Sequence, residues 1–280
     1  MMSGVTGLSI AVRLSMCLAI AIGVSAGGDQ AAPIARTLRV LTYNIRHGEG
    51  MDGLIELSRQ AAIMMSVRPD LVALQEVDEH TVRTGGVNQL QELARLTGLY
   101  AQFGKAMDYA GGSYGVAVLS RWPVVSARNQ PLPGFQDREP RTALTVLVMV
   151  DAARPVLFTS THLDQGRDEE NRLAQVSHLN ASPVGAGSPE ILAGDLNSRP
   201  EAAVIRLLEA EWTNATPADS PLSMALDGSL RFRRDYIMVR PTHCWRVIES
   251  RVIDDRVASD HQPVLVVLEW PATCLAAKRP

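Results

Sequence analysis

The sequence is poor in aromatic residues and has no excess of basic ones. Phe, Trp and Tyr together make up 5% of the 280 residues, and the formal net charge at pH 7 is −3. A mildly acidic surface does not attract a polyanion such as duplex DNA, so DNA binding would need a local basic groove. The dense cationic stretch of the chain spans only residues 231–234. The composition therefore gives no general support to a stable nucleic-acid partner.

The chain also lacks a low-complexity linker, an internal repeat and an apolar run long enough to span a bilayer. At this length it suits one large α/β domain better than two small ones. The apolar residues 14–26 end in Val24-Ser25-Ala26, a pattern typical of signal-peptide cleavage. We predict a signal peptide at residues 1–26, a linker at 27–37, one domain at 38–270 and a C-terminal tail at 271–280.

These boundaries predict an exported, periplasmic or extracellular monomer without a membrane span after cleavage. The alternatives are an uncleaved anchor and a cytosolic protein with a misassigned start. Cleavage removes Arg13 and no acidic residue, so the formal net charge goes from −3 to −4. Of the three cysteines it leaves Cys244 and Cys274, which predicts a disulfide in an oxidising compartment. Two buried thiols are the alternative.

Helix-like and strand-like stretches alternate along the domain. Helices are expected at residues 54–67, 87–97, 167–180 and 202–210. Strands are expected at residues 38–45, 70–76, 100–104, 114–120, 141–150, 155–162, 190–194, 235–239, 245–253 and 263–270. Since three strands follow one another without helices between residues 100 and 150, part of a sheet is antiparallel. The pattern predicts two mixed sheets packed face to face, with helices outside.

Polar side chains stand at the ends of six of these strands. Open α/β sheets place their chemistry at strand ends, where side chains from several strands converge. The residues are Asn44, Glu76, His162, Asp195 with Asn197, Asp235, and Asp260 with His261. Carboxylates, amides and imidazoles in this arrangement indicate a metal-assisted phosphoesterase.

Glu76 is the principal metal ligand that we predict. It follows the apolar run of residues 71–74, whose burial would make an unpaired acid costly. Mg²⁺ or Mn²⁺ prefers carboxylate and amide oxygens, so Asn44 and Asp260 are expected to join Glu76 at the metal. The alternatives are a solvated acid for Glu76 and an Asx turn for Asn44.

Asp195 and Asn197 are expected to act together. Two positions apart in an extended chain, their side chains leave the same face of the strand. Asp195 would orient or deprotonate the attacking water, while Asn197 would donate to a phosphoryl oxygen. The alternative is an ordinary strand-to-loop turn.

Two histidines complete the catalytic candidates. Asp235 could orient His261 and hold it charged, so that the imidazolium faces the phosphate or serves as acid or base. A lone histidine at the end of a strand is more often structural. The other polar residues at strand ends favour a catalytic role for His162.

Side chains away from these strand ends could contact the substrate. Arg138 or Arg141 could clamp the phosphate bidentately, and only one of them need do so. The loop residues His47, Asp164 and Arg167 are expected to shape substrate choice rather than chemistry.

These motifs resemble those of the endonuclease/exonuclease/phosphatase superfamily, over residues 38–268. The most specific are Gly-Asp-Leu-Asn at 194–197 and Ser-Asp-His at 259–261. The blocks T-Y-N-I-R-H-G and R-T-G-G are similar to the bacterial metal-dependent hydrolase branch. The resemblance implies a four-layer α/β/β/α sandwich with the site at one end of the sheets.

The resemblance also implies roles for single residues. These are an Asp-His pair at Asp235 and His261, a metal contact at Asp260, a second catalytic histidine at His162 and a phosphate-contacting tyrosine at Tyr114. A core tyrosine is an equally good account of Tyr114. The chain departs from the family at Arg234, where an aliphatic residue is usual. Arg234 is expected to line the pocket or to pair close to Asp235.

The expected function is that of a divalent-metal-dependent phosphohydrolase acting by direct water attack, since no serine or cysteine sits in a nucleophile motif. The acidic composition and the scarcity of aromatics suit a small or lipid-headgroup phosphodiester. A secreted, DNase-like endonuclease is one alternative. A non-catalytic module that binds phosphorylated ligands is another, and it would have no need for both a water-orienting acid and an Asp-His pair.

Overall fold

The computed structural model describes Met1 and residues 35–135, 137–152, 154–181, 188–216, 224–226, 230–271 and 274. Apart from Met1, the predicted signal peptide at residues 1–26 lies outside the described residues, as do most of the predicted linker and tail. Within the described part of the chain, no helix is long and apolar enough to cross a membrane.

Two six-stranded sheets dominate the described residues. The first has the order β13-β14-β1-β2-β4-β3, and the second has the order β5-β6-β7-β8-β12-β9. The strands of the first sheet are β13 (Arg246–Val252), β14 (Val264–Trp270), β1 (Arg36–Asn44), β2 (Leu71–Glu79), β4 (Gly112–Ser120) and β3 (Tyr100–Tyr109). The strands of the second sheet are β5 (Val124–Pro131), β6 (Thr142–Asp151), β7 (Arg154–His162), β8 (Glu190–Asp195), β12 (Asp235–Arg240) and β9 (Thr213–Asn214). A separate hairpin pairs β10 (Met224–Leu226) with β11 (Leu230–Phe232).

Each large sheet contains one parallel pair, β1 with β2 and β7 with β8, and its other neighbours are antiparallel. A helical crossover joins the strands of each parallel pair, as parallel pairing requires. The helices are α1 (Leu57–Val67), α2 (Gln89–Thr97), α3 (Glu170–Ala181) and α4 (Ala203–Glu209). Short 3-10 turns are η1 (Arg46–Gly48), η2 (Val82–Thr84) and η3 (Thr242–Cys244).

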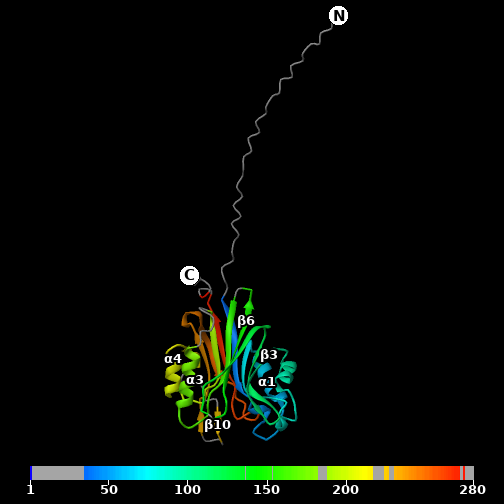
Figure 1. The fold of residues 1–280 in the computed structure, drawn as a ribbon, viewed down its shortest axis with the longest axis vertical. Coiled ribbons are helices and arrows are strands. Elements are labelled where there is room, and N and C mark those ends of the chain that lie inside the picture. The colour runs from blue at the N-terminus through cyan, green and yellow to red at the C-terminus, as the bar shows by residue number, and fades with distance from the viewer. Residues whose placement is uncertain are drawn as a thin grey trace. The chain divides into compact units, whose positions relative to one another are not determined.

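The sheets pack face to face, and the helices cover their outer faces (Figure 1). Along β1, Leu38 and Val40 point between the sheets, whereas Leu41 and Tyr43 point toward α1 and α2. The second sheet packs against α3 and α4 through a further apolar cluster. Since both faces are covered, the central strands are apolar on both sides. The predicted four-layer α/β/β/α sandwich is confirmed.

Buried polar contacts join the two sheets next to the strand ends that carry the candidate residues. Gln75 Nε2 donates to Ser160 Oγ (3.4 Å), and Ser160 Oγ donates to the carbonyl oxygen of Leu74 (3.1 Å). Gln75 immediately precedes Glu76, and Ser160 lies two residues before His162. These contacts hold the middle of β2 against the end of β7, so residues from both sheets can meet in one site.

Cys244 and Cys274 are joined by a disulfide, with their Cα atoms 4.8 Å apart. Both are buried in the cluster between the sheets, which also holds the contacting rings of Trp245 and Trp270. The predicted disulfide is thus present, and the alternative of two buried thiols is wrong.

Candidate active site

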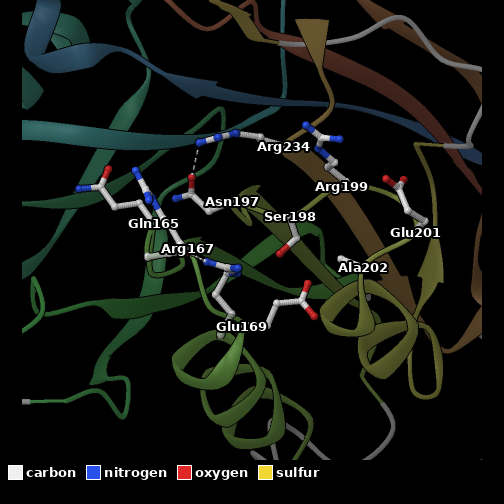
Figure 2. A pocket seen from close by; sticks show the side chains of 11 residues that line it. Gln165, Arg167, Glu169, Asn197, Ser198, Arg199, Glu201, Ala202 and Arg234 are labelled. Carbon is white, nitrogen blue, oxygen red and sulfur yellow. Dashed lines mark hydrogen bonds between the residues drawn. The ribbon is translucent and has the colours of Figure 1, made fainter. Parts of the chain in front are cut away.

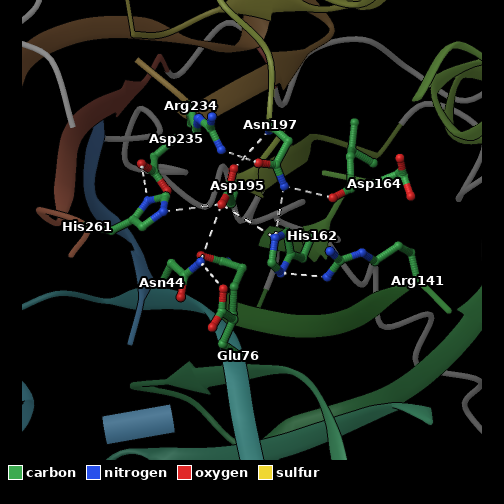
Figure 3. A network of polar contacts seen from close by, with 12 residues as sticks. Asn44, Glu76, Arg141, His162, Asp164, Asp195, Asn197, Arg234, Asp235 and His261 are labelled. Carbon is green, nitrogen blue, oxygen red and sulfur yellow. Dashed lines mark hydrogen bonds and ion pairs between the residues drawn. The ribbon is translucent and has the colours of Figure 1, made fainter. Parts of the chain in front are cut away.

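The polar residues predicted at strand ends converge at one end of the sheets, around Asp195 (Figure 3). Asn44 and Glu76 come from the parallel pair β1 and β2, and His162 and Asp195 come from the parallel pair β7 and β8. Asp235 begins β12 and lies opposite Asp195 in the antiparallel register. His261 lies in the turn before β14. The first sheet and the second therefore each supply part of the site.

Glu76 is aimed by a bulge in β2. The pairing of β2 with β4 shifts register between Leu74 and Val77, and Glu76 has a φ of +57°. A bulge of this kind re-aims a side chain, and a positive φ is costly for a residue other than glycine. The Glu76 carboxylate accepts a hydrogen bond from Asn44 Nδ2 (2.9 Å). The strand expected to end at Glu76 continues to Glu79, so Glu76 lies inside β2 at the bulge, and backbone strain of this kind is typical of a functional site.

The charge environment of Glu76 is anionic. Burial raises the pKa of Glu76, and the carboxylates of Asp260 and Asp195 raise it further. The hydrogen bond from Asn44 and the charge of His261 act in the opposite direction on this pKa but do not offset burial. A divalent cation beside Glu76 would relieve this excess of negative charge.

Asn44 bridges two carboxylates. Its Nδ2 donates to Glu76 Oε1 and to Asp195 Oδ2 (3.3 Å), while its Oδ1 accepts from the backbone N–H of Arg46 (3.0 Å). A backbone N–H can only donate, so this contact fixes which end of the amide is oxygen. The Asx turn considered for Asn44 is present, and it orients the amide toward the acids.

Asp195 is buried and surrounded by donors. Its Oδ1 accepts from the backbone N–H of Asn197 (2.8 Å), and its Oδ2 lies 3.5 Å from Nε2 of both His162 and His261. Asn197 has a φ of +48°, so the turn after β8 is itself strained. Burial raises the pKa of Asp195, against the charge of His261, and the neighbouring Asp235 carboxylate adds to the rise.

His261 is a buried cation between two carboxylates. Its Nδ1 lies 2.9 Å from Asp235 Oδ2, and its Nε2 faces Asp195. Burial opposes the charge, but Asp235 and Asp195 outweigh it and raise the pKa of His261 to about 10. Both ring nitrogens therefore carry protons at neutral pH. The predicted Asp235–His261 pair has hydrogen-bonding geometry despite the arginine that precedes Asp235.

His162 is in the opposite protonation state. Burial lowers its pKa well below the usual value, and Arg141 lowers it further. Arg141 Nη1 lies 3.0 Å from Nδ1, and Asn197 Nδ2 lies 3.0 Å from Nε2. A neutral imidazole has one N–H, so only one of these contacts is a hydrogen bond. The guanidinium of Arg141 and the NH2 group of Asn197 both only donate, so the ring accepts from one of them and carries its single proton on the other nitrogen.

The predicted substrate contacts have mixed locations. Arg141 is buried, with Nη1 bonded to His162 and to Glu139 Oε1 (2.7 Å). It lines a small hollow of about 150 Å³ that Tyr114, Glu76 and His162 also line. Arg138 instead pairs with Asp168 at the surface, at 3.0 Å. A phosphate in the small hollow could therefore reach Arg141.

Several residues could hold a metal ion. Among the described residues, ligand atoms of Asp195, Asp235 and His261 lie within 4.8 Å of one another. These are not the predicted ligands Asn44, Glu76 and Asp260, of which Asp260 is half-buried and accepts from Ser259 Oγ (3.3 Å). Carboxylates with one imidazole suit several divalent ions. A doubly protonated imidazole has no lone pair for a metal, so this set could hold a divalent ion only where His261 gives up a proton, and it does not specify which ion.

Sequence reasoning did not name the partners that Ser259 and Arg234 have in the site, although it expected Arg234 to line the pocket or to pair close to Asp235. Ser259 Oγ donates to the carbonyl oxygen of Asn44 (2.8 Å) and accepts from the backbone N–H of His261 (3.2 Å). Arg234 Nη1 donates to Asn197 Oδ1 (2.7 Å). The importance of Ser259 could have been inferred from the sequence, since Ser259 begins the Ser-Asp-His block. The partner of Arg234 depends on the three-dimensional meeting of two loops, which no local pattern shows.

Comparison with known proteins gives the family. The model of the Endonuclease/Exonuclease/phosphatase family matches residues 41–261. No curated protein matches the chain. An endonuclease/exonuclease/phosphatase structure from Beutenbergia cavernae is similar, with 25% identity and a TM-score of 0.69, over 84% of this chain and 72% of that one.

Two further solved structures share the fold. A mannosyl-6-phosphatase from Bacteroides thetaiotaomicron has 19% identity and a TM-score of 0.67, over 82% of this chain and 99% of that one. The human Nocturnin catalytic domain with a bound sulfate anion has 21% identity and a TM-score of 0.64, over 84% of this chain and 95% of that one. The matched residues run from β1 to His261 and so include every strand end of the site. The chain belongs to the endonuclease/exonuclease/phosphatase family of phosphoester hydrolases.

Proposed function

We propose that this protein is an exported, divalent-metal-dependent phosphohydrolase that cleaves a small or lipid-headgroup phosphodiester by direct attack of water. The observation that carries the proposal is the position of Asp195. Its Oδ2 lies 3.5 Å from two histidines, of which one is a cation fixed by Asp235 and the other is neutral. One carboxylate is thus placed beside both a positive group and a proton donor.

Each residue has a role in this scheme. Glu76, with Asp260, would hold the metal ion, which when bound neutralises phosphoryl oxygens. Asn44, predicted as a further ligand, turns its Nδ2 to the carboxylates of Glu76 and Asp195 and so orients these acids instead. Asp195 orients the attacking water and takes its proton at Oδ2, a role that its raised pKa favours.

The histidines act on the charge that develops at the phosphate. The imidazolium of His261 stabilises negative charge on the phosphoryl oxygens, and Asp235 keeps this ring charged and oriented. In this scheme His162 carries its proton on Nε2, 3.5 Å from Asp195 Oδ2, and donates it to a phosphoryl or leaving oxygen. Asn197 Nδ2 donates one hydrogen to the carbonyl oxygen of Leu163 and has a second for a phosphoryl oxygen.

We also propose that the protein works as a monomer outside the cytoplasm, without a membrane span after cleavage and without a stable nucleic-acid partner. The disulfide supports export, because such bonds persist in oxidising compartments. The net charge of −3 supports a substrate other than duplex DNA.

A phosphomonoester is the second candidate substrate. The similar structure from Bacteroides thetaiotaomicron is that of a mannosyl-6-phosphatase, which acts on a monoester of a sugar. A shared fold does not fix the substrate, so both ester classes belong in the test.

The test is an assay of the purified full chain with Mg²⁺ or Mn²⁺ against bis-p-nitrophenyl phosphate, p-nitrophenyl phosphate, sphingomyelin, inositol phosphates and plasmid DNA. Glu76→Gln is the matched variant, since it keeps the shape of the side chain and removes its charge. We expect metal-dependent turnover of a small ester, lost in the variant while the circular dichroism spectrum stays unchanged. Wild-type rates in excess chelator would contradict metal dependence, and DNA as the preferred substrate would favour the endonuclease alternative.

A further inference from the structure

A second hollow, of about 540 Å³, opens beside Asn197 (Figure 2). Its walls come from the loop and first helical turn after β7, from the loop after β8, and from the residue that precedes β12. We call it the arginine pocket because four arginines line it, namely Arg167, Arg172, Arg199 and Arg234. Neither the proposed water attack nor the metal site uses this pocket.

The arginine pocket is positively charged in an acidic protein. Four guanidinium groups face two carboxylates, those of Glu169 and Glu201, so the lining carries a formal charge of +2. The whole chain has a formal charge of −3. A concave region with charge of one sign raises the local concentration of ions of opposite charge. The pocket therefore favours an anion.

Several donors in the arginine pocket have no protein acceptor. Ser198 is 5% exposed, and its buried Oγ has no hydrogen-bond partner. The buried Nε of Arg172 also has none, although its Nη1 donates to the carbonyl oxygen of Asp164. Arg167 is exposed and forms no hydrogen bond or ion pair with any residue that the structure describes. The Ser198 and Arg172 atoms have almost no accessible surface, so the donor that a ligand in the pocket can reach directly is the exposed guanidinium of Arg167.

The arginine pocket and the candidate active site share Asn197. On one side, the backbone N–H of Asn197 donates to Asp195 Oδ1 (2.8 Å). On the other side, Asn197 Oδ1 accepts from Arg234 Nη1 (2.7 Å). The arginine pocket and Asp195 are therefore neighbours on the two sides of Asn197.

We propose that the arginine pocket binds a second anionic group of the substrate, separate from the phosphate that is hydrolysed. The group is a phosphate or a carboxylate, since a guanidinium recognises the oxygens of both bidentately. This inference rests on the proposed function and narrows it to phosphate esters that carry two anionic groups. Arg167 and Arg199 are positioned to hold the second group from two different loops.

The test compares substrates that differ only in the second anionic group. Inositol 1,4-bisphosphate is paired with inositol 1-phosphate, and 2-phosphoglycerate is paired with glycerol 2-phosphate, all in excess Mg²⁺. We expect kcat/KM to be roughly tenfold higher for the doubly anionic member of at least one pair, as for a charge-assisted hydrogen bond. A preference in the first pair identifies phosphate as the second group, and one in the second pair identifies carboxylate.

Arginine variants assign the preference to the pocket. Arg167→Ala and Arg199→Ala should each lower the ratio of kcat/KM within the preferred pair about fivefold or more. Arg128→Ala is the matched control, because Arg128 is exposed on β5 and does not line the pocket. It removes the same charge and should leave the ratio unchanged. The proposal is overturned if kcat/KM is equal for the two members of each pair. It is also overturned if the ratio of kcat/KM within the preferred pair is the same in Arg167→Ala and Arg199→Ala as in Arg128→Ala.

Calorimetry separates this inference from the proposed function. Inositol 1,4-bisphosphate and 2-phosphoglycerate are titrated into the metal-free full chain and into the three variants. Weaker binding in Arg167→Ala and Arg199→Ala, but not in Arg128→Ala, supports the arginine pocket even where no ester is hydrolysed. Equal binding of both compounds by wild type and all variants contradicts the pocket even where hydrolysis is observed.

Discussion

At the scale of single residues, burial lowers the pKa of both histidines, and the group behind each ring decides whether that effect is reinforced or overcome. His261 has the Asp235 carboxylate behind Nδ1, and His162 has the Arg141 guanidinium behind Nδ1. An anion in that position keeps an imidazole charged, and a cation keeps it neutral. Two rings at the same distance from Asp195 therefore differ in charge: His261 is a cation and His162 is neutral.

This difference predicts opposite titrations in the metal-free protein. The pKa of His261 is raised to about 10 and that of His162 is lowered well below 6.5. In an NMR titration of the histidine ring carbons, we expect His261 to stay charged from pH 6 to pH 9 and His162 to stay neutral. Arg141→Gln should raise the pKa of His162, because it removes the neighbouring cation. Titration of both rings near 6.5 would show that neither partner sets the charge.

The same shift makes stability depend on pH. The folded-state pKa of His261 exceeds the value of 6.5 for an unperturbed histidine. Its contribution to the free energy of unfolding is therefore present in full below about pH 6.5 and is lost as the pH rises through about 10. Urea unfolding of the wild type at pH 6 and pH 9, beside Asp235→Asn, should show the larger pH dependence in the wild type.

The role of Asp195 predicts a loss in kcat rather than in KM. Asp195→Asn keeps the oxygen that accepts from the backbone of Asn197 and removes the charge that would take a proton. We expect kcat to fall on the order of a hundredfold or more in Asp195→Asn and in His261→Ala. The double mutant should lose less than the product of the two single losses, since both residues act on one transition state. An unchanged kcat in Asp195→Asn would remove its role in water activation.

At the scale of secondary structure, elements with a buried face were predicted from the sequence, whereas of two largely exposed edge strands β13 was predicted, at residues 245–253, and β5 was not. The central strands β1, β2, β7 and β8 were found within a few residues because their apolar runs are continuous. The edge strand β5, Val124–Pro131, was missed because nearly all its side chains are exposed and show no apolar alternation. The helix expected from residue 54 begins at Leu57, because Leu54 and Ile55 lie exposed in the loop before it.

The candidate site shows the same division. Convergence of the strand-end residues could be predicted, since neighbouring strands deliver their ends to one place. The direction of the Glu76 side chain could not be predicted, because it depends on a register shift between β2 and β4, which lies far along the chain. The contact of Arg141 with His162 and the arginine pocket were likewise hidden, since loops from different parts of the chain form them.

Helix α2 offers a prediction at this scale. The side chain of Asn88 caps its first turn by accepting from the backbone N–H of Gln91 (2.9 Å), and it also donates to Glu79 Oε1 (3.0 Å). Asn88→Ala should lower the free energy of unfolding by about 1 kcal/mol, as for other N-caps. Asn88→Ser keeps a capping oxygen and should recover most of that loss. Equal urea midpoints for wild type and Asn88→Ala would show that the cap does not stabilise the fold.

At the scale of the whole molecule, the site depends on the pairing of the two sheets. Asn44 and Glu76 come from one sheet and His162 and Asp195 from the other, so neither half could hold the arrangement alone. The sheets are held together by the apolar cluster between them, and the disulfide lies within that cluster. Stability and catalysis are thus linked through sheet packing, although different residues serve each.

The disulfide lets these two properties be separated. Strand β12 begins at Asp235 in the site and ends at Arg240, and Cys244 follows in η3 at the opposite end, about 20 Å away at the usual rise per residue. Replacing Cys244 and Cys274 together by Ala should lower the free energy of unfolding by about 2–4 kcal/mol, because the unfolded chain is no longer cross-linked. The value of kcat at 25 °C should be unchanged, since the bond lies beyond the end of β12 that is opposite Asp235. Dithiothreitol should destabilise the wild type and leave the double variant unaffected. A wild-type urea midpoint that reductant does not move, together with two freely alkylated thiols in the purified exported protein, would show that the bond does not form.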